Sequence, residues 1–193
     1  IDVEEKMGSR STFLKIGMGG FDGRKLQSGD VIPSRKTPPL KNIKKRFVSV
    51  PEKEETAVLR AVLGPQDDMF SAEELEKFFG REYTVTPASD RMGIRLSAPD
   101  AIKPINGSDI ISDGIVSGSV QVPKNGQPII LCADRQTTGG YAKIATVISS
   151  DMHKCAQLTA GNKVRFEKIS IEDAQKIRKE KTEYFNKLKK RMK

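Results

Sequence analysis

Hydrophobic and polar positions alternate in short runs along the middle of the chain, and this pattern predicts many short strands. Residues 57–63, residues 82–86 and the stretch that ends at Leu96 are each only a few residues long and rich in β-branched or aromatic side chains. Short runs of this kind, separated by Gly, Pro, Asn and Asp, are typical of β-sandwiches and β-barrels. No apolar run approaches the roughly 18 residues that a membrane-spanning helix needs.

The second half of the chain continues the same pattern. Residues 110–122 carry β-branched side chains interrupted by Gly114 and Gly118, which predicts bent or bulged strands. Asn125-Gly126 is a strong hairpin signal, and it joins that region to the apolar residues 128–132. Further strands are predicted over residues 144–148 and 164–169. The chain is therefore predicted to be mainly β, with a closed or partly closed barrel.

Three helices are expected. Ser71 and Glu74 form a capping box for a helix that ends at Gly80, and Ser150 or Asp151 precedes a second short helix. Ser170 begins a C-terminal amphipathic helix with acidic residues near its start and basic residues near its end, as the helix dipole favours. Its apolar stripe consists of Ile171, Ala174, Ile177, Tyr184, Phe185, Leu188 and Met192. This stripe is expected to pack on the barrel or on a partner; a helix lying on a membrane surface is the alternative.

The net charge of +9 is concentrated in two segments. Residues 35–46 contain six basic residues and no acidic one, and residues 171–193 contain nine basic residues against four acidic ones. The remainder of the chain is close to neutral. The basic segments contain no nucleic-acid-binding motif and lack the interleaved aromatic residues of a stacking platform, so no nucleic acid is expected as a partner.

Cysteine and histidine give no sign of a metal or redox site. Cys132 and Cys155 lack the spacing of zinc or redox motifs, so reduced thiols in a cytoplasmic protein are expected. His153 is the only histidine and is predicted on a short surface helix, without a catalytic role. We therefore expect no metal in the site.

The densest group of candidate functional residues lies between two predicted strands, over residues 133–141. Its polar members and its glycine pair are Asp134, Arg135, Gln136, Thr137, Thr138, Gly139, Gly140 and Tyr141. A carboxylate, a guanidinium, an amide, hydroxyl groups and approachable backbone N–H groups suit a small molecule that is anionic or carries an amide. The alternative is a tight turn in which Asp134 and the threonines satisfy local backbone groups.

A second polar loop, residues 88–93, contains Ser89, Asp90 and Arg91. Together with several other strings it carries a resemblance to a known family. These strings are Gly8-Ser9-Arg10-Ser11-Thr12, Gly19-Gly20-Phe21, Leu26-x-x-Gly29-Asp30, Gly64-Pro65-Gln66, residues 89–96, residues 121–128 and residues 133–141. In this order, over about residues 1–170, they resemble the biotin-dependent carboxyltransferase family, also called allophanate hydrolase subunit 2, which has KipA-like members.

The resemblance implies a domain organisation. Residues 53–170 are expected to form a cyclophilin-like β-barrel, and residues 1–32 the end of a preceding subdomain whose start is absent. Residues 33–52, basic and containing Pro38-Pro39, are expected to be a linker. Residues 171–193, the basic amphipathic helix, lie outside the resemblance.

The resemblance also implies a function. It suggests a bacterial hydrolase subunit that works with a KipI-like, B-type partner of the allophanate hydrolase subunit 1 kind and with an A-type partner. Together they open 5-oxo-L-proline to L-glutamate with ATP, which is bound at the level of the complex; this chain alone is expected to be inactive. One alternative is carboxyl transfer from carboxybiotin to urea or a related amide, with biotin on a partner chain because no Met-Lys-Met signal occurs here. Another is a regulator that binds a kinase inhibitor without turnover.

For 5-oxoproline, the two polar loops offer matching groups. Arg135 or Arg91 is expected to bind the substrate carboxylate, with Asp134 or Asp90 orienting the arginine or acting as a base. Backbone N–H groups near Gly139 and Gly140, with Thr137 or Thr138, are expected to stabilise charge on the lactam oxygen, and Gln121 to bond the amide. Ser89, Gln136 and Tyr141 complete the predicted substrate-binding set. The alternative is that Asp90–Arg91 and Asp134–Arg135 are ion pairs that brace the two loops.

Overall fold

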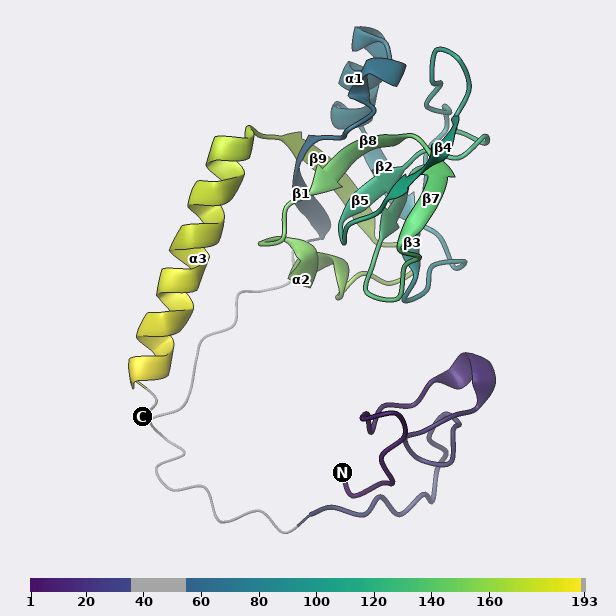
Figure 1. Ribbon diagram of the computed structural model, residues 1–193, viewed down its shortest axis with the longest axis vertical. Coiled ribbons are helices and arrows are strands. Elements are labelled where there is room, and N and C mark those ends of the chain that lie inside the picture. Colours follow the sequence, from purple (N-terminus) through teal and green to yellow (C-terminus); the bar gives the residue numbers. More distant parts are fainter. Residues whose placement is uncertain (36–54, 192–193) are drawn as a thin grey trace. The chain divides into compact units, whose positions relative to one another are not determined.

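A computed structural model of the protein describes residues 1–35 and 55–191 (Figure 1). Contacts between residues divide the chain into two compact units, residues 1–48 and residues 49–193. Apart from residues 33–35, the predicted linker lies outside the described residues.

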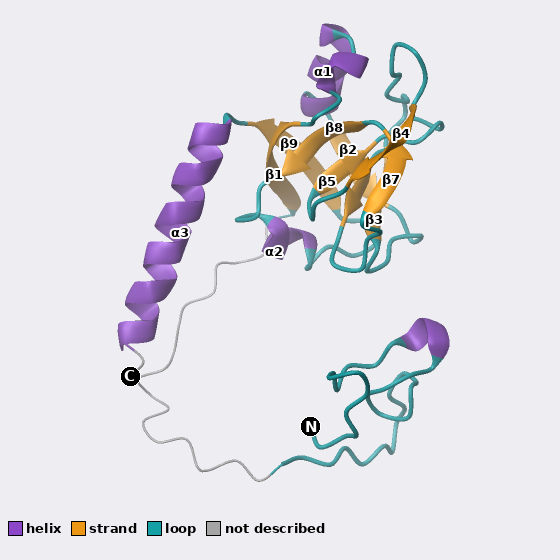
Figure 2. Cartoon of the chain, in the orientation of Figure 1, coloured by secondary structure: helices purple, strands orange, loops and turns teal. Residues whose placement is uncertain are grey.

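A closed β-barrel forms the body of the second unit (Figure 2). Around the barrel the strands follow the order β1 (Thr56–Leu63), β8 (Lys143–Val147), β5 (Ser119–Gln121), β6 (Ile129–Leu131), β3 (Gly93–Ser97), β2 (Glu82–Val85) and β9 (Lys163–Lys168). The barrel closes where β9 pairs in parallel with β1, and the other neighbouring strands are antiparallel. The predicted mainly β fold with a closed barrel and a C-terminal helix is confirmed.

Aromatic rings fill the end of the barrel that α1 (Ala72–Phe79) covers. Phe78 of α1 stacks on Phe166 with a distance of 4.5 Å between ring centroids, and Tyr83 meets Phe166 edge-on at 5.6 Å. The buried hydroxyl of Tyr83 donates to the carbonyl oxygen of Phe78 at 3.1 Å, so the phenol group is not left unsatisfied. The side chain of Ser71 accepts a hydrogen bond from the backbone N–H of Glu74, which confirms the predicted N-cap.

A two-stranded ribbon accompanies the barrel. It pairs β4 (Asp109–Gly114) with β7 (Thr138–Tyr141) in antiparallel fashion, with an irregularity between Asp109 and Asp113. The prediction that residues 133–141 form a polar loop throughout is therefore wrong for the last four of them. Thr138 and Tyr141 favour extended backbone, and pairing with β4 satisfies backbone groups of this glycine-containing segment.

Two further helices are α2 (Met152–Cys155), which lies between β8 and β9, and α3 (Ile171–Arg191), which follows β9. The side chain of Ser170 accepts from the N–H of Asp173 at 3.0 Å, so the predicted start of the C-terminal helix is confirmed. The predicted packing of its apolar stripe on the barrel is not observed for the aromatic residues. Tyr184 and Phe185 are exposed, and no residue of α3 within the described chain is buried. Lys181 contacts the barrel unit instead, through the carbonyl oxygen of Ser150 and the ring of His153.

The described part of the first unit, residues 1–35, consists mainly of turns and contains a short 3₁₀ helix, η1 (Leu14–Ile16). Within its described part, Arg24 forms a two-pronged pair with Asp30, with N–O distances of 2.9 and 2.8 Å. Large apolar side chains such as Met7, Ile16 and Val31 are exposed. None of the helices in residues 1–35 and 55–191 is long and apolar enough to cross a membrane.

Candidate functional site

An ion pair joins the two polar loops that the sequence singled out. The guanidinium of Arg91, in the loop after β2, donates to both carboxylate oxygens of Asp134, in the loop after β6, at 2.7 and 3.0 Å. The backbone strengthens the link, because the N–H of Asp134 donates to the carbonyl oxygen of Arg91 at 3.0 Å. The bracing pair therefore crosses from one loop to the other, whereas sequence reasoning considered pairs of adjacent residues.

Ser89 and Asp90 shape the first of these loops. A carboxylate oxygen of Asp90 accepts from the backbone N–H groups of Met92 and Gly93 at 2.8 and 3.2 Å. The hydroxyl of Ser89 accepts from the N–H of Arg95 at 2.9 Å. Both side chains thus satisfy local backbone donors, which is the usual contribution of Asp and Ser to a turn.

Arg135 is held by backbone carbonyl oxygens on two sides. Its Nε donates to Ile115 at 3.3 Å and its Nη1 to Cys132 at 3.2 Å. The N–H of Ile115 in turn donates to the carbonyl oxygen of Thr137 at 2.9 Å. Arg135 and Thr137 therefore tie the polar stretch to the segment between β4 and β5, while Thr138 lies exposed at the start of β7.

Gly139 lies where two amide side chains meet. A methyl group at this position would lie 2.6 Å from Cδ1 of Ile115, 2.9 Å from Nε2 of Gln121 and 3.3 Å from Nε2 of Gln136. Gln121 is buried, and its Nε2 donates to the carbonyl oxygen of Tyr141 at 3.4 Å. The absence of a side chain at Gly139 thus allows β7 to lie against these amides, which brings together three residues of the predicted set: Gln121, Gln136 and Gly139.

The structure adds a buried lysine that sequence reasoning missed. Lys143, the first residue of β8, is 1% exposed, and its ammonium donates to Asp113 Oδ2 at 2.6 Å and to the carbonyl oxygen of Gly114 at 3.1 Å. The side chain of Gln66 contacts both partners, donating to Asp113 at 3.3 Å and accepting from the backbone N–H of Lys143 at 3.2 Å. The hydrogen bond from Lys143 lowers the pKa of the Asp113 carboxyl group.

Lys143 and Gln121 belong to one surface of the barrel. They are paired residues on the neighbouring antiparallel strands β8 and β5, so their side chains project from the same face. Both reach the ribbon: Lys143 contacts the end of β4, and Gln121 contacts the end of β7. A buried polar layer therefore lies between the barrel and the ribbon, directly beside Gly139.

The signal that would have identified this layer is weak in the sequence. Lys143 begins an apolar strand, where a lysine is normally read as a solvent-exposed end residue. Gln66 lies two positions after Gly64. The backbone of Gly64 packs so closely against β8 that a side chain at this position would meet the carbonyl oxygen of Lys143 at 1.9 Å. In the sequence, the Gly-Pro-Gln string stands out only as part of the family resemblance.

Metal-ligating and nucleophilic residues do not gather in this region. In residues 1–35 and 55–191, no group of three or more His, Cys, Asp or Glu is arranged to hold a metal ion. Burial raises the pKa of Cys155 to about 12 and also raises that of Cys132, so neither thiol is an activated nucleophile. His153 lies on the surface of α2 as predicted, beside Lys181.

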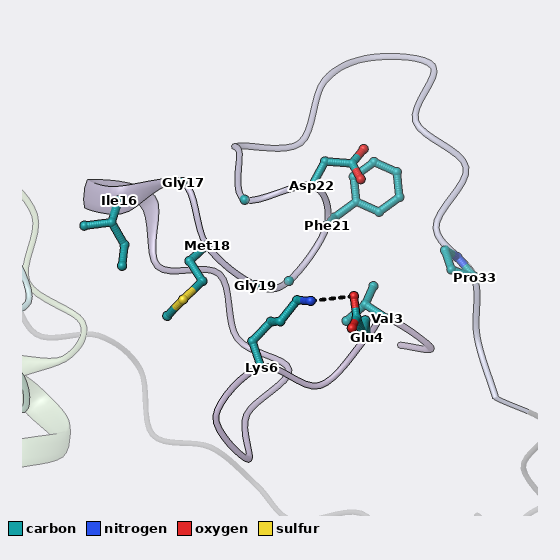
Figure 3. A pocket seen from close by; sticks show the side chains of 12 residues that line it. Val3, Glu4, Lys6, Ile16, Gly17, Met18, Gly19, Phe21, Asp22 and Pro33 are labelled. Atoms are coloured by element: carbon teal, nitrogen blue, oxygen red, sulfur yellow. Dashed lines mark ion pairs between the residues drawn. The ribbon is translucent and has the colours of Figure 1, made fainter.

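The first unit contains a pocket of its own (Figure 3). It measures about 690 Å³ and is lined mainly by glycines and apolar residues, including Ile16, Met18 and Phe21. Three charged residues also line it, and two of them, Lys6 and Glu4, form an ion pair at 2.7 Å; the third is Asp22.

Backbone crowding explains the glycine-rich turn that lines this pocket. Gly19 adopts a left-handed backbone conformation in which a side chain would meet the carbonyl oxygen of Ser11 at 2.6 Å. Gly20 and Gly23 have positive φ values as well, so glycine is the residue that such a turn favours. The glycines are thus required by the turn itself.

A known protein family matches residues 1–168 of the chain. It is described as the carboxyltransferase domain, subdomain A and B. The C-terminal helix α3 lies beyond the match.

Curated relatives extend this result. The chain is 38% identical to the C subunit of 5-oxoprolinase from Escherichia coli (strain K12) over 97% of its own length and 59% of the relative. It is 35% identical to the protein of the same name from Haemophilus influenzae, over 96% of this chain and 59% of the relative. A putative urea carboxylase of Emericella nidulans is 29% identical over 93% of this chain and 15% of the relative. The chain thus spans about three fifths of the length of the first two relatives.

The fold also resembles a solved structure. The crystal structure of the Kluyveromyces lactis urea carboxylase matches 97% of this chain with a TM-score of 0.74 and 26% identity. The match covers 18% of that much longer chain.

Proposed function

Because the chain belongs to the carboxyltransferase domain family with subdomains A and B, we propose that it is part of a 5-oxoprolinase subunit. In this proposal it works with a KipI-like, B-type partner and an A-type partner, and the complex uses ATP to open 5-oxo-L-proline to L-glutamate. The observation that carries the proposal is the 38% identity to a protein named as the C subunit of 5-oxoprolinase, which extends over 97% of this chain and hence through both polar loops.

The two polar loops and β7 offer groups that a small lactam bearing a carboxylate would need. Arg91 is the more accessible of the two candidate arginines, with a side chain that is 80% exposed, whereas Arg135 is occupied by backbone carbonyl oxygens. An exposed ion pair contributes little to stability, so Arg91 exchanges Asp134 for a substrate carboxylate at small cost. We therefore assign the carboxylate to Arg91 and the amide to the region around Gln121 and Gly139.

Carboxyl transfer is the second candidate. It is supported by the relative named putative urea carboxylase and by the fold match to the Kluyveromyces lactis urea carboxylase. In that case the substrate is urea or a related amide, and carboxybiotin arrives on a partner chain.

Reconstitution tests the proposal. The protein, at the length of its curated relatives, is combined with its A-type and B-type partners, and 5-oxoproline-dependent ATP hydrolysis and glutamate release are measured. We expect turnover in the wild-type complex and a large rise in the KM for 5-oxoproline in Arg91→Ala. Arg165→Ala, which removes another exposed arginine paired with a carboxylate, is the matched control and should behave as wild type.

A complex that assembles but releases no glutamate contradicts the proposal. Urea-dependent carboxylation by the same complex, after addition of a carboxybiotin-bearing partner, would then select carboxyl transfer. Binding to the B-type partner without either reaction would select a regulatory role.

A further inference from the structure

The ion pair of Lys143 is unusual because its two charges lie in different environments. The lysine is 1% exposed, whereas the side chain of its partner Asp113 is 52% exposed. Lysine is almost never fully buried unless it is paired, and taking an ammonium out of water is expensive even then. An apolar residue at position 143 would fill the same layer without that cost, so a purely structural role gives little reason for a charge there.

The ammonium keeps hydrogen-bonding capacity. A lysine side chain has three N–H donors. Within the described part of the chain, its acceptors are Asp113 and the carbonyl oxygen of Gly114. One donor therefore remains available to a ligand, in a layer where water is largely excluded and electrostatic interactions are strong.

Two amide side chains belong to the same layer as Lys143. Gln121 projects from the same barrel face as Lys143, and Gln66 contacts the backbone of Lys143 and the carboxylate of Asp113. A carboxamide offers one acceptor and two donors, so it pairs with the N–H and the C=O of another amide. Gly139 lets the backbone of β7 lie directly beside Gln121, since a methyl group there would lie only 2.9 Å from Nε2 of that amide.

We propose that Lys143 donates a hydrogen bond to the carbonyl oxygen of a small amide substrate, while Gln121 pairs with the same amide group. Asp113, with Gln66, is a positioning residue that holds the ammonium before the substrate arrives. The choice of a lactam as the ligand rests on the proposed function. A fixed ammonium in a dry layer stabilises the negative charge that develops on the carbonyl oxygen when an amide is attacked or activated.

Binding of a matched ligand pair tests this subsite. The reconstituted complex is titrated calorimetrically with 5-oxoproline and with its thiolactam analogue, in which a weaker sulfur acceptor replaces the carbonyl oxygen. Wild-type protein should bind the carbonyl compound about tenfold more tightly or better, as expected for a hydrogen bond from a charged donor. In Lys143→Met this preference should largely disappear, whereas Lys163→Met, which removes an exposed strand lysine, should retain it.

A structural role for Lys143 makes a different prediction. Loss of packing weakens the binding of both ligands equally. An unchanged preference for the carbonyl compound in Lys143→Met therefore overturns the proposal. Isotope-edited infrared spectroscopy of bound 5-oxoproline, labelled with ¹³C at the lactam carbonyl, needs no variant and decides the matter if Lys143→Met fails to fold. The carbonyl stretch should lie at a lower frequency in the wild-type complex than in water; an equal or higher frequency contradicts the proposal.

The subsite and the proposed function fail in distinguishable ways. A carbonyl preference that depends on Lys143, without glutamate release, supports the subsite and contradicts the reaction. Normal glutamate release with a preference that does not depend on Lys143 supports the reaction and contradicts the subsite. A complex that binds no 5-oxoproline contradicts both.

Discussion

Among single residues, Asp151 makes extensive contacts for a buried charged group. Its carboxylate accepts from the backbone N–H of Arg60 at 3.0 Å, from Nε at 2.9 Å and from Nη2 at 2.6 Å. Burial disfavours the charged form of Asp151 and raises the pKa of its carboxyl group. The hydrogen bonds from Arg60 together lower this pKa by more, so the net shift is downward. Asp151 thereby fastens the start of α2 to β1.

Asp151→Asn should therefore destabilise the barrel at neutral pH, by about 3 kcal/mol, because breaking a buried pair leaves its partner without compensation. A carboxylate with a lowered folded-state pKa stabilises the protein above its unfolded-state pKa, near 4, and loses that contribution as the pH falls through the folded-state value. The difference between wild type and variant in urea unfolding should thus be largest at pH 7 and shrink in acid. Asp100→Asn, at an exposed position, is the control; a difference independent of pH would contradict the assignment.

The two cysteines lead to a second prediction at this scale. Burial raises the pKa of Cys155 to about 12 and raises that of Cys132 as well. Only the thiolate reacts readily, so an alkylating reagent at pH 8 should modify Cys155 negligibly in the folded protein and rapidly in denaturant. Mass spectrometry of the labelled peptides measures both rates. Rapid labelling of Cys155 without denaturant would show that α2 opens readily.

At the scale of elements, the glycine pair of β7 offers a matched comparison. A methyl group at Gly139 would crowd Ile115 and the amide of Gln121, whereas at Gly140 its nearest neighbour, the carbonyl oxygen of Ile110, would lie at 3.4 Å. Neither glycine has a positive φ, so alanine fits the backbone at both positions.

Gly139→Ala should consequently displace Gln121 and weaken 5-oxoproline binding by the complex at least several-fold. The crowded atoms are the ends of flexible side chains, so the loss of stability should stay within about 1–3 kcal/mol. Gly140→Ala should change neither quantity appreciably. Calorimetric titration and thermal unfolding provide the two readouts, and equal effects of the two substitutions would argue against a binding role for the amide of Gln121 beside Gly139.

The same elements show what the sequence reveals and what it hides. The cap at Ser71, the cap at Ser170 and the hairpin around Asn125-Gly126 depend on residues only a few positions apart, and all three are confirmed. The strand β7 was missed because its partner β4 lies more than twenty residues earlier and its own glycines resemble a loop. The local sequence pattern does not show which distant strands pair with each other.

The candidate site is hidden for the same reason. Arg91 and Asp134 are 43 positions apart, and Lys143 and Asp113 are 30 apart, so both pairs exist only once the barrel has closed. Sequence reasoning did identify a group that the fold brings together, namely Gln121, Gln136 and Gly139. The roles assigned to the predicted site residues stay predictions.

At the scale of the whole molecule, the buried hydrophobic core of the described chain lies within the second unit. Its buried hydrophobic residues run from Leu59 to Phe166. The described residues of the first unit expose large apolar side chains, and α3 buries none of its own. Neither residues 1–35 nor α3 therefore adds a buried apolar residue to the barrel.

This distribution predicts that the barrel folds by itself. A fragment comprising residues 53–193 should unfold cooperatively at the same midpoint as the full 193-residue chain, and residues 53–170 should lose at most a few degrees, because the hydrogen bond of Lys181 to Ser150 is removed. Differential scanning calorimetry of the three proteins measures the midpoints and the cooperativity. A non-cooperative transition in residues 53–193 would show that the first unit completes the barrel, and the domain boundary near residue 53 would then be wrong. A large loss confined to residues 53–170 would instead show that α3, despite its exposed aromatic residues, is part of the folding unit.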